Sequence, residues 1–163
     1  MKRSYKLAGL ITLVVVALDQ ATKAWILANI ILYTTHPVIP DFFNIVHVLN
    51  KGAAFGFLNR SDITWQTYLF FATTAMAVVL ILHLLRAALE EDTTLICGLG
   101  LILGGAIGNL IDRIRFGEVV DFLDFHYGDL HWPAFNVADI AITLGSVALM
   151  AAFLRARKAP PEE

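Results

Sequence analysis

The stretch TTLICGLGLILGGAIGNLIDRI, residues 93–114, decides the fold. No charged side chain occurs in it before Asp112, and about 20 apolar residues suffice for a helix to cross roughly 30 Å of hydrocarbon. Gly100, Gly104 and Gly108 recur at four-residue steps. Small residues at this spacing let helices approach one another closely within a membrane. We therefore expect residues 93–114 to form a membrane-spanning helix that packs against other helices.

The composition of the whole chain agrees with a membrane protein. Of its 163 residues 58% are hydrophobic and 16% are charged, and the mean hydropathy is +0.68. A soluble domain has about 45–50% apolar and about 25% charged residues. The net charge of −2 gives no basic surface for nucleic acid, so we expect no nucleic-acid partner. The single cysteine, Cys97, cannot form an internal disulfide.

Four segments are apolar over the length that a membrane-spanning helix requires. They are residues 7–30, 63–85, 93–114 and 134–154, and none contains a proline that would force a kink. The first segment and the basic residues before it resemble a signal peptide, but no small-residue cleavage site follows, so we expect a retained helix. The sequence predicts an all-α membrane protein with one integral membrane domain, residues 1–163.

The distribution of Lys and Arg near the ends of the segments predicts the orientation. If both termini lie on one side, that side carries Lys2, Arg3, Lys6, Arg86, Arg155, Arg157 and Lys158, against Lys51, Arg60, Arg113 and Arg115 on the other. Cytoplasmic loops carry an excess of Lys and Arg, so we expect both termini to be cytoplasmic. Residues 31–62 and 115–133 are then extracytoplasmic.

The two extracytoplasmic connections differ in character. Residues 31–62 are too apolar for a simple loop, and the run FFNIVHVL at 42–49 mixes aromatic and β-branched residues before the turn signal Asn50-Lys51-Gly52. This pattern predicts a small extracytoplasmic β-sheet that rests on the membrane surface. The second connection is rich in aromatic residues that suit the headgroup level, and we expect residues 122–133 to form a loop.

The polar residues of the segments gather at one depth. At about 1.5 Å per residue, Asp19 lies roughly 18 Å and Asn109 roughly 24 Å from the inner ends of their segments, and Asp139 lies about 8 Å below the outer end of the fourth. Asp112, Arg113 and Asp121 belong to the same zone. A charge in hydrocarbon costs at least about 2.5–3.5 kcal/mol, so such groups usually face a functional cavity. The pattern predicts an outward-facing polar pocket, although Asp19 and Lys23 could also form an ordinary ion pair four residues apart.

Asp121 and Asp139 are the expected catalytic pair. Asp121 follows a helix-stop signal at Gly117, and Asp139 falls in the first turns of the fourth segment, where a helix N-terminus stabilises an anion. Two carboxylates held close together cannot easily both ionise, so one keeps a proton while the other is charged. Such a pair can activate water and protonate an amide. We expect the two carboxyl groups to share one water.

Other chemistries have weaker support. A metal site could be imagined from Asp121, Asp124, His126 and His131, but no metal-binding spacing occurs, and we expect neither a metal nor a cofactor. Cys97 has no histidine near it in the sequence, and no serine lies in a nucleophile motif.

Five short motifs follow one another between residues 19 and 139. They are Asp19-Gln20-x-Thr22-Lys23, Asn50-x-Gly52-Ala53-Ala54-Phe55-Gly56, Gly104-Gly105-Ala106-x-Gly108-Asn109-x-x-Asp112-Arg113, Val120-Asp121-Phe122 and Phe135-Asn136-x-Ala138-Asp139. In content and order this set resembles the lipoprotein signal peptidase family (signal peptidase II), whose members are bacterial inner-membrane aspartic endopeptidases.

The resemblance implies an activity and a set of site residues. It implies that Asp121 and Asp139 are catalytic and that the enzyme cuts diacylglyceryl-modified prolipoproteins just before the lipidated cysteine, near the outer leaflet. Supporting or substrate-binding positions would be Asp19, Lys23, Asn50, Gly52, Asn109, Asp112, Arg113 and Asn136, with Asp112 bracing the site. The family's fold adds a small periplasmic sheet and a short interfacial helix to four membrane helices. Its members use no metal and are inhibited by globomycin. We expect a monomer whose partners are the substrate and membrane lipid.

Two other functions compete with the peptidase. In a small proton-coupled transporter, Asp19, Lys23 and Asp139 would relay protons, but polar groups should then continue across the whole bilayer. A purely structural membrane subunit would not need so many charges at one depth. Both alternatives are therefore less well supported than the enzyme.

Overall fold

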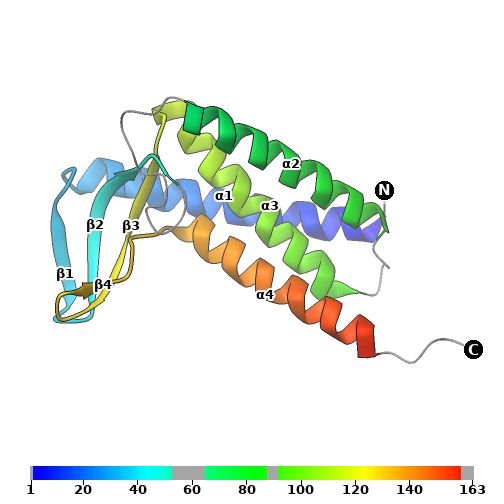
Figure 1. Cartoon of the computed structure of the whole chain (residues 1–163). Helices are drawn as coiled ribbons and strands as arrows, with labels where there is room; N and C mark the ends of the chain where they lie inside the picture. Colours follow the sequence, from blue (N-terminus) through cyan, green and yellow to red (C-terminus); the bar gives the residue numbers. More distant parts are fainter. Residues whose placement is uncertain (1, 53–64, 88–91, 159–163) are drawn as a thin grey trace, which may run out of the picture.

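The computed structural model describes residues 2–52, 65–87 and 92–158. Figure 1 shows a bundle of long helices with a small sheet at one end. The elements are α1 (Arg3–Asn29), β1 (Thr35–Ile39), β2 (Phe43–Asn50), α2 (Trp65–Ala87), α3 (Thr93–Phe116), β3 (Val119–Tyr127), β4 (Leu130–His131) and α4 (Val137–Lys158). Four helices in the described residues are long and apolar enough to cross a membrane, which confirms the predicted fold class.

The helix boundaries differ from the predicted ones at several ends. α1 begins at Arg3 rather than at residue 7, and α4 begins at Val137 rather than at residue 134. The later start of α4 has a physical cause, because Phe135 is held by a bridge to Leu123 of β3 and cannot join the helix. The predicted start of the second segment, residue 63, lies outside the described residues. The short interfacial helix has no counterpart in the described ranges and stays a prediction.

α3 lies at the centre of the bundle, between α1 and α4, because its glycines expose backbone on two faces. A Cβ on Gly100 or Gly104 would meet Ala8 or Val15 of α1 at 2.7–3.2 Å. On the other side, a Cβ on Gly105 would collide with the carbonyl oxygen of Ala138 in α4. The glycine spacing therefore packs helices closely, as the sequence predicted.

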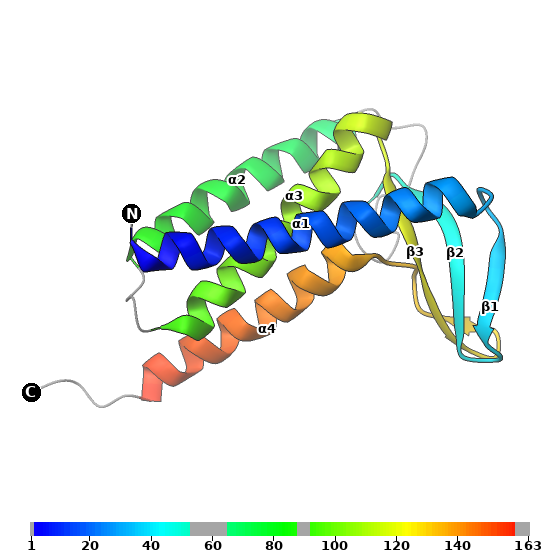
Figure 2. The same cartoon turned by 180° about the vertical axis from the view of Figure 1, so that it is seen from behind.

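The surface of the bundle is apolar, as expected for helices whose solvent is lipid. Leu13 on α1, Val79 on α2 and Val147 on α4 each expose more than 60% of their surface. A buried apolar cluster fills the end of the bundle away from the sheet, with the members Ala8, Ile81, Leu85, Ile96 and Leu99. α1 begins and α4 ends at that same end (Figure 2).

The sheet is antiparallel with the strand order β1-β2-β3-β4. Residues 122–133, predicted as a loop, instead continue β3 to Tyr127 and add β4, so this prediction is wrong. The strand is stabilised by pairing with β2, in which Asn50 lies opposite Val119 and Phe43 opposite Phe125. α3 ends at Phe116, and the left-handed φ of 76° at the next residue, Gly117, turns the chain directly into β3. β3 therefore starts at the polar end of α3.

Candidate active site

A cavity of about 630 Å³ lies where α2, α3, α4 and the sheet meet. Its polar lining includes Asn50, Asn109, Arg113, Asp121 and Asp139. Three threonines, Thr73, Thr74 and Thr143, also line it. Most of the remaining wall consists of apolar side chains from the three helices and from the segment before α4; among them are Phe70, Ala77, Ile102, Trp132, Phe135, Ile140 and Leu144. The cavity therefore combines a polar region, which carries both aspartates, with a larger apolar lining.

Asp121 and Asp139 both line this cavity and share one hydrogen-bonding partner. Asn136 donates its side-chain N–H to Asp121 Oδ1 over 2.7 Å. Its backbone N–H donates to Asp139 Oδ2 over 3.2 Å, and its side-chain oxygen accepts from the backbone N–H of Asp139 over 3.0 Å. A single residue at the start of α4 thus holds both carboxyl groups. The structure brings together the two aspartates that the sequence singled out.

Two further amides fix the orientation of the carboxyl groups. Asn50, at the end of β2, donates to Asp121 Oδ2 over 3.0 Å. Asn109 on α3 donates to Asp139 Oδ1 over 2.8 Å and accepts from the side chain of Asn136 over 3.2 Å. Each carboxyl group therefore accepts hydrogen bonds from at least two donors.

Asp121 has an unusual electrostatic environment. Only 2% of its surface is exposed. Burial and then the charge of Asp139 raise its pKa to about 7, against the opposing effects of hydrogen bonds from Asn50 and Asn136 and of the charge of Lys23. Near neutral pH this carboxyl group therefore retains a proton in a large fraction of molecules.

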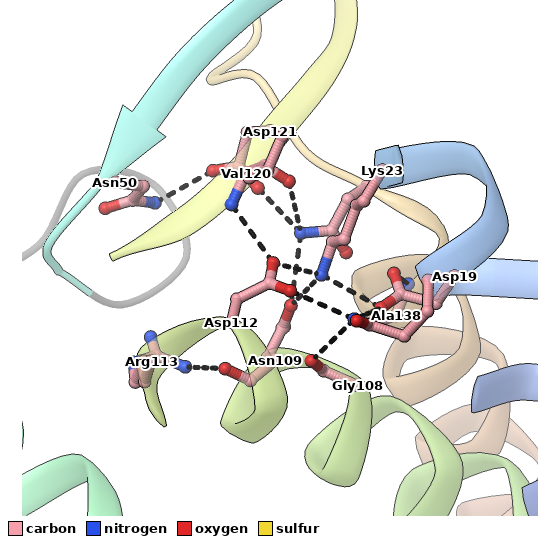
Figure 3. Close-up of polar contacts among 12 residues, drawn as sticks. Asp19, Lys23, Asn50, Gly108, Asn109, Asp112, Arg113, Val120, Asp121 and Ala138 are labelled. Atoms are coloured by element: carbon pink, nitrogen blue, oxygen red, sulfur yellow. Dashed lines mark hydrogen bonds and ion pairs between the residues drawn. The ribbon is translucent and has the colours of Figure 1, made fainter. Parts of the chain in front are cut away.

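A second group of charges is buried beside the cavity (Figure 3). Lys23 Nζ lies 2.9 Å from Asp19 Oδ2, 2.8 Å from Asp112 Oδ2 and 2.9 Å from Asn109 Oδ1. The three charged side chains are at most 2% exposed. The sequence left open whether Asp19 and Lys23 serve a pocket or form an ion pair within the helix, and the structure shows the ion pair.

Arg113 is fixed at the edge of the cavity by contacts on two sides. Its guanidinium donates to the carbonyl oxygen of Gly52 over 2.9 Å and lies over the ring of Phe70, 4.3 Å from the centroid. The guanidinium thereby ties the end of β2 to α2 and α3. Gly52 lines the cavity as well, and its N–H donates to Asn50 Oδ1 over 2.8 Å.

Three of the four residues considered for a metal site, Asp124, His126 and His131, contact one another. His131 Nδ1 lies 2.8 Å from Asp124 Oδ1, and Asn44 donates to Asp124 Oδ2 over 2.8 Å. His126 stacks on His131 with ring centroids 4.7 Å apart. The fourth, Asp121, lines the cavity and bonds Asn50 and Asn136 instead. No group of three or more potential ligands is found within residues 2–52, 65–87 and 92–158.

The sequence analysis assigns no role to Gln20 or Phe70, although Gln20 stands in the first of the five motifs. Gln20 donates to Asp19 Oδ2, to the carbonyl oxygen of Gly108 and to Asp112 Oδ1, at 3.2, 3.2 and 2.9 Å. A polar amide inside an apolar segment was the signal that could have identified it. Phe70, which receives the guanidinium of Arg113, looks like any other apolar residue of its segment and carries no such signal.

The model of the family described as Signal peptidase (SPase) II matches residues 11–155. The chain belongs to the signal peptidase II family. The lipoprotein signal peptidase of Maridesulfovibrio salexigens is 57% identical over 93% of this chain and 97% of that protein, and that of Oleidesulfovibrio alaskensis is 54% identical over 90% and 93%.

Solved structures of bacterial membrane enzymes share this fold. A bacterial membrane enzyme determined by the in meso method at 2.3 Å resolution superposes with a TM-score of 0.83 and 32% identity, over 96% of this chain and 93% of that one. A second such enzyme, determined at 1.9 Å resolution, superposes with a TM-score of 0.76 and 33% identity, over 91% of this chain and 92% of that one. The chain is thus a multi-pass membrane protein of a peptidase family, and nothing in these comparisons supports a transporter.

Proposed function

We propose that this protein is a lipoprotein signal peptidase of the aspartic type, which removes signal peptides from diacylglyceryl-modified prolipoproteins by cutting just before the lipidated cysteine. The observation that carries the proposal is the pair Asp121 and Asp139, held by Asn136 in the polar region of one cavity. The relatives named lipoprotein signal peptidase supply the substrate class.

In this mechanism Asp121 holds the proton and Asp139 is the base. Asp121 has a pKa of about 7 because it is buried next to the charge of Asp139. Asp139 lies in the first turn of α4, where the helix dipole stabilises a negative charge. Asp139 removes a proton from the attacking water while Asp121 protonates the oxygen of the scissile carbonyl. When the C–N bond breaks, Asp139 returns its proton to the leaving nitrogen, and Asp121 recovers its own from the former carbonyl oxygen.

The remaining polar residues would support this chemistry at two levels. Asn50, Gly52, Asn109 and Arg113 line the cavity, and they would orient the carboxyl groups or contact the substrate main chain. Asp19, Lys23 and Asp112 lie behind them and would brace the site. Asn136 belongs to both levels, because it binds Asp121 directly and caps α4.

The apolar part of the cavity fits the lipidated part of the substrate. Phe70 and Ala77 of α2, Ile102 of α3, and Ile140 and Leu144 of α4 give the cavity an apolar wall. Acyl chains and the apolar core of a signal peptide would bury their surface there. Burial contributes about 0.8 kcal/mol for each CH₂ group. We expect globomycin, which inhibits the family that the motifs resemble, to occupy the same cavity.

The proposed cellular setting follows from the same features. The protein would lie in the bacterial inner membrane as a monomer and a single domain, residues 1–163. Both termini would be cytoplasmic, which places the sheet and the two aspartates near the outer leaflet. The positive-inside distribution of Lys and Arg supports this orientation.

Replacement of the two aspartates tests the proposal. Asp121→Asn and Asp139→Asn, assayed as purified proteins on a lipidated prolipoprotein, should each lower the cleavage rate by at least about 10²–10⁴-fold, the usual contribution of a general acid or base. Asp124→Asn is a matched control, because Asp124 is a buried aspartate on the same strand that bonds Asn44 and His131 instead. Normal cleavage by the Asp139→Asn protein would refute the mechanism.

A further inference from the structure

Asp121 and Asp139 are held in place through the neighbouring backbone as well as through their side chains. The residue before each of them donates its backbone N–H to a second, deeper aspartate. Ala138, which precedes Asp139, donates to Asp19 Oδ1 over 3.0 Å. Val120, which precedes Asp121, donates to Asp112 Oδ2 over 3.2 Å.

Lys23 joins these two anchors into one unit. Its ammonium lies 2.9 Å from Asp19 and 2.8 Å from Asp112, so one cation holds the two aspartates that fix the two backbones (Figure 3). The helices and strand that carry these groups are far apart in the sequence, since Ala138 follows Asp19 by 119 residues. The separation of Asp121 and Asp139 therefore depends on a contact within α1 and on another between α1 and α3.

Lys23 also determines which way the amide of Asn109 points. An ammonium group can only donate, so the Asn109 atom 2.9 Å from Lys23 Nζ must be the oxygen. The side chain of Asn136 donates to the same oxygen. The amide nitrogen of Asn109 is thereby turned toward Asp139, to which it donates over 2.8 Å. With Asp19, Asp112 and Asn109 as acceptors, all three N–H groups of Lys23 are in use.

We propose that Lys23, Asp19 and Asp112 form a buried clamp that sets the separation and orientation of Asp121 and Asp139, and so act as positioning residues for peptide cleavage. None of these three described side chains is among the residues that line the cavity. The clamp therefore influences the reaction through the backbone of β3 and α4 rather than through contact with the substrate. The inference rests on the proposed function, because it assigns a reason for the geometry of that catalytic pair.

The test is a kinetic comparison of purified proteins on a lipidated prolipoprotein. Lys23→Met retains the length of the side chain without its charge. Because it leaves two carboxylates without a counter-charge, the double variant Lys23→Met/Asp112→Asn, which keeps the total charge, is measured beside it. Both should lower kcat about 10²-fold, the loss that accompanies a displacement of about 1 Å at a reacting group, while KM stays unchanged. The two limbs of the pH–rate profile should also converge, since carboxyl groups that move apart interact less.

Two controls separate positioning from general stability. Asp112→Asn retains an oxygen that can accept from Val120, whereas Asp112→Ala does not, so the Asn variant should keep more of the wild-type kcat. Leu99→Ala creates a cavity in the apolar cluster at the far end of the bundle. If Leu99→Ala lowers the melting temperature as much as the Lys23 variants do, it should still leave kcat and the pH–rate profile unaltered.

Each outcome has a definite meaning. The clamp is refuted if the Lys23 variants raise KM at constant kcat, if Asp112→Asn and Asp112→Ala lose the same kcat, or if Leu99→Ala reproduces the effect. Failure of the underlying function looks different, because Asp139→Asn would then remain active. An inactive Asp139→Asn protein together with fully active Lys23 variants would refute the clamp alone.

Discussion

Asp121 combines a position on a strand with a pKa near 7, and this combination makes the pH dependence of cleavage predictable. If Asp121 must deliver a proton, the rate should fall as the pH rises above about 7 and the protonated fraction declines. The measurement is kcat against pH with a lipidated substrate, between about pH 5 and 9, in a detergent without ionisable groups. A rate that keeps rising beyond pH 8 would assign the proton to another residue.

The same pKa makes the stability of the fold depend on pH. An unfolded aspartate has a pKa of about 3.9. Since the folded protein binds this proton more tightly than the unfolded chain, the stabilisation is complete below about pH 4 and is lost as the pH rises through about 7. Asp121→Asn should reduce this decline in the free energy of unfolding. The reduction is about 1.4 kcal/mol for each pKa unit by which the folded and unfolded values of Asp121 differ. Melting temperatures of both proteins in detergent across this range provide the comparison, and an identical decline in both would contradict it.

Individual side chains also show what the sequence could and could not reveal at this scale. Asp121 and Asp139 were identified because a carboxylate at a membrane boundary requires an explanation. The contacts of Asn136 with both could not be derived from spacing, because they depend on how β3 meets the start of α4. Phe70 could not be identified from the sequence for a different reason. An aromatic residue in an apolar helix is common and gives no sign of a functional role.

At the scale of elements, the close contact of α3 with α4 leads to a stability prediction. Gly105→Ala should destabilise the protein, because the added methyl would collide with the backbone of Ala138 and a carbonyl cannot rotate away. Overpacking of this kind costs about 1–3 kcal/mol. Gly9→Ala is the matched control on α1, where a Cβ would meet nothing within 4 Å. Alanine should be neutral or stabilising there, because glycine within a helix is roughly 0.5–1 kcal/mol less favourable.

Unfolding in detergent by heat or denaturant measures both glycine variants. An equal stability of Gly105→Ala and the unaltered protein would show that α3 and α4 can separate without cost. Gly105→Ala should also affect cleavage, since Ala138 directly precedes Asp139 and a shift of its backbone would move that carboxyl group.

Helices were easier to predict than strands in this chain. Long apolar runs set the helices by composition alone, whereas β3 depends on pairing with β2, whose Asn50 lies 71 residues before Asp121 in sequence. The run VVDFLDFHY does alternate apolar and polar residues over part of its length. The sequence nevertheless predicts a loop from residue 122 onward, because no local feature shows which strand this run would join.

At the scale of the whole molecule, the orientation in the membrane can be tested directly. Asn50 and His131 should be extracytoplasmic and both termini cytoplasmic. After Cys97 is replaced by Ser, single cysteines at these two positions should react in intact cells with a thiol reagent that cannot cross the membrane. A cysteine at Lys2 should react only after the membrane is permeabilised. Labelling of position 2 alone in intact cells would reverse the orientation and place the catalytic pair in the wrong compartment.

Because the cavity has both a polar and an apolar lining, we expect the rate of cleavage to depend on the lipid of the substrate. A prolipoprotein peptide without the diacylglyceryl group should be a poor substrate, because the apolar wall contributed by α2, α3 and α4 remains unfilled. The comparison is kcat/KM for the same peptide with and without the lipid, in the same detergent. Equal values would mean that the protein recognises the peptide sequence alone.

The spacing of Asp19 and Lys23 on α1 has a consequence for biogenesis. During translation α1 reaches the membrane before α3 exists, so Asp112 cannot yet neutralise Lys23. Asp19 can neutralise Lys23, because it lies one helical turn away on the same helix, with its Oδ2 2.9 Å from Lys23 Nζ. This ion pair needs no other part of the chain. The first helix therefore enters the bilayer with its charges already paired, which lowers the cost of about 2.5–3.5 kcal/mol for each charge at the centre. The clamp is half assembled from the moment of insertion, and the later arrival of α3 completes it.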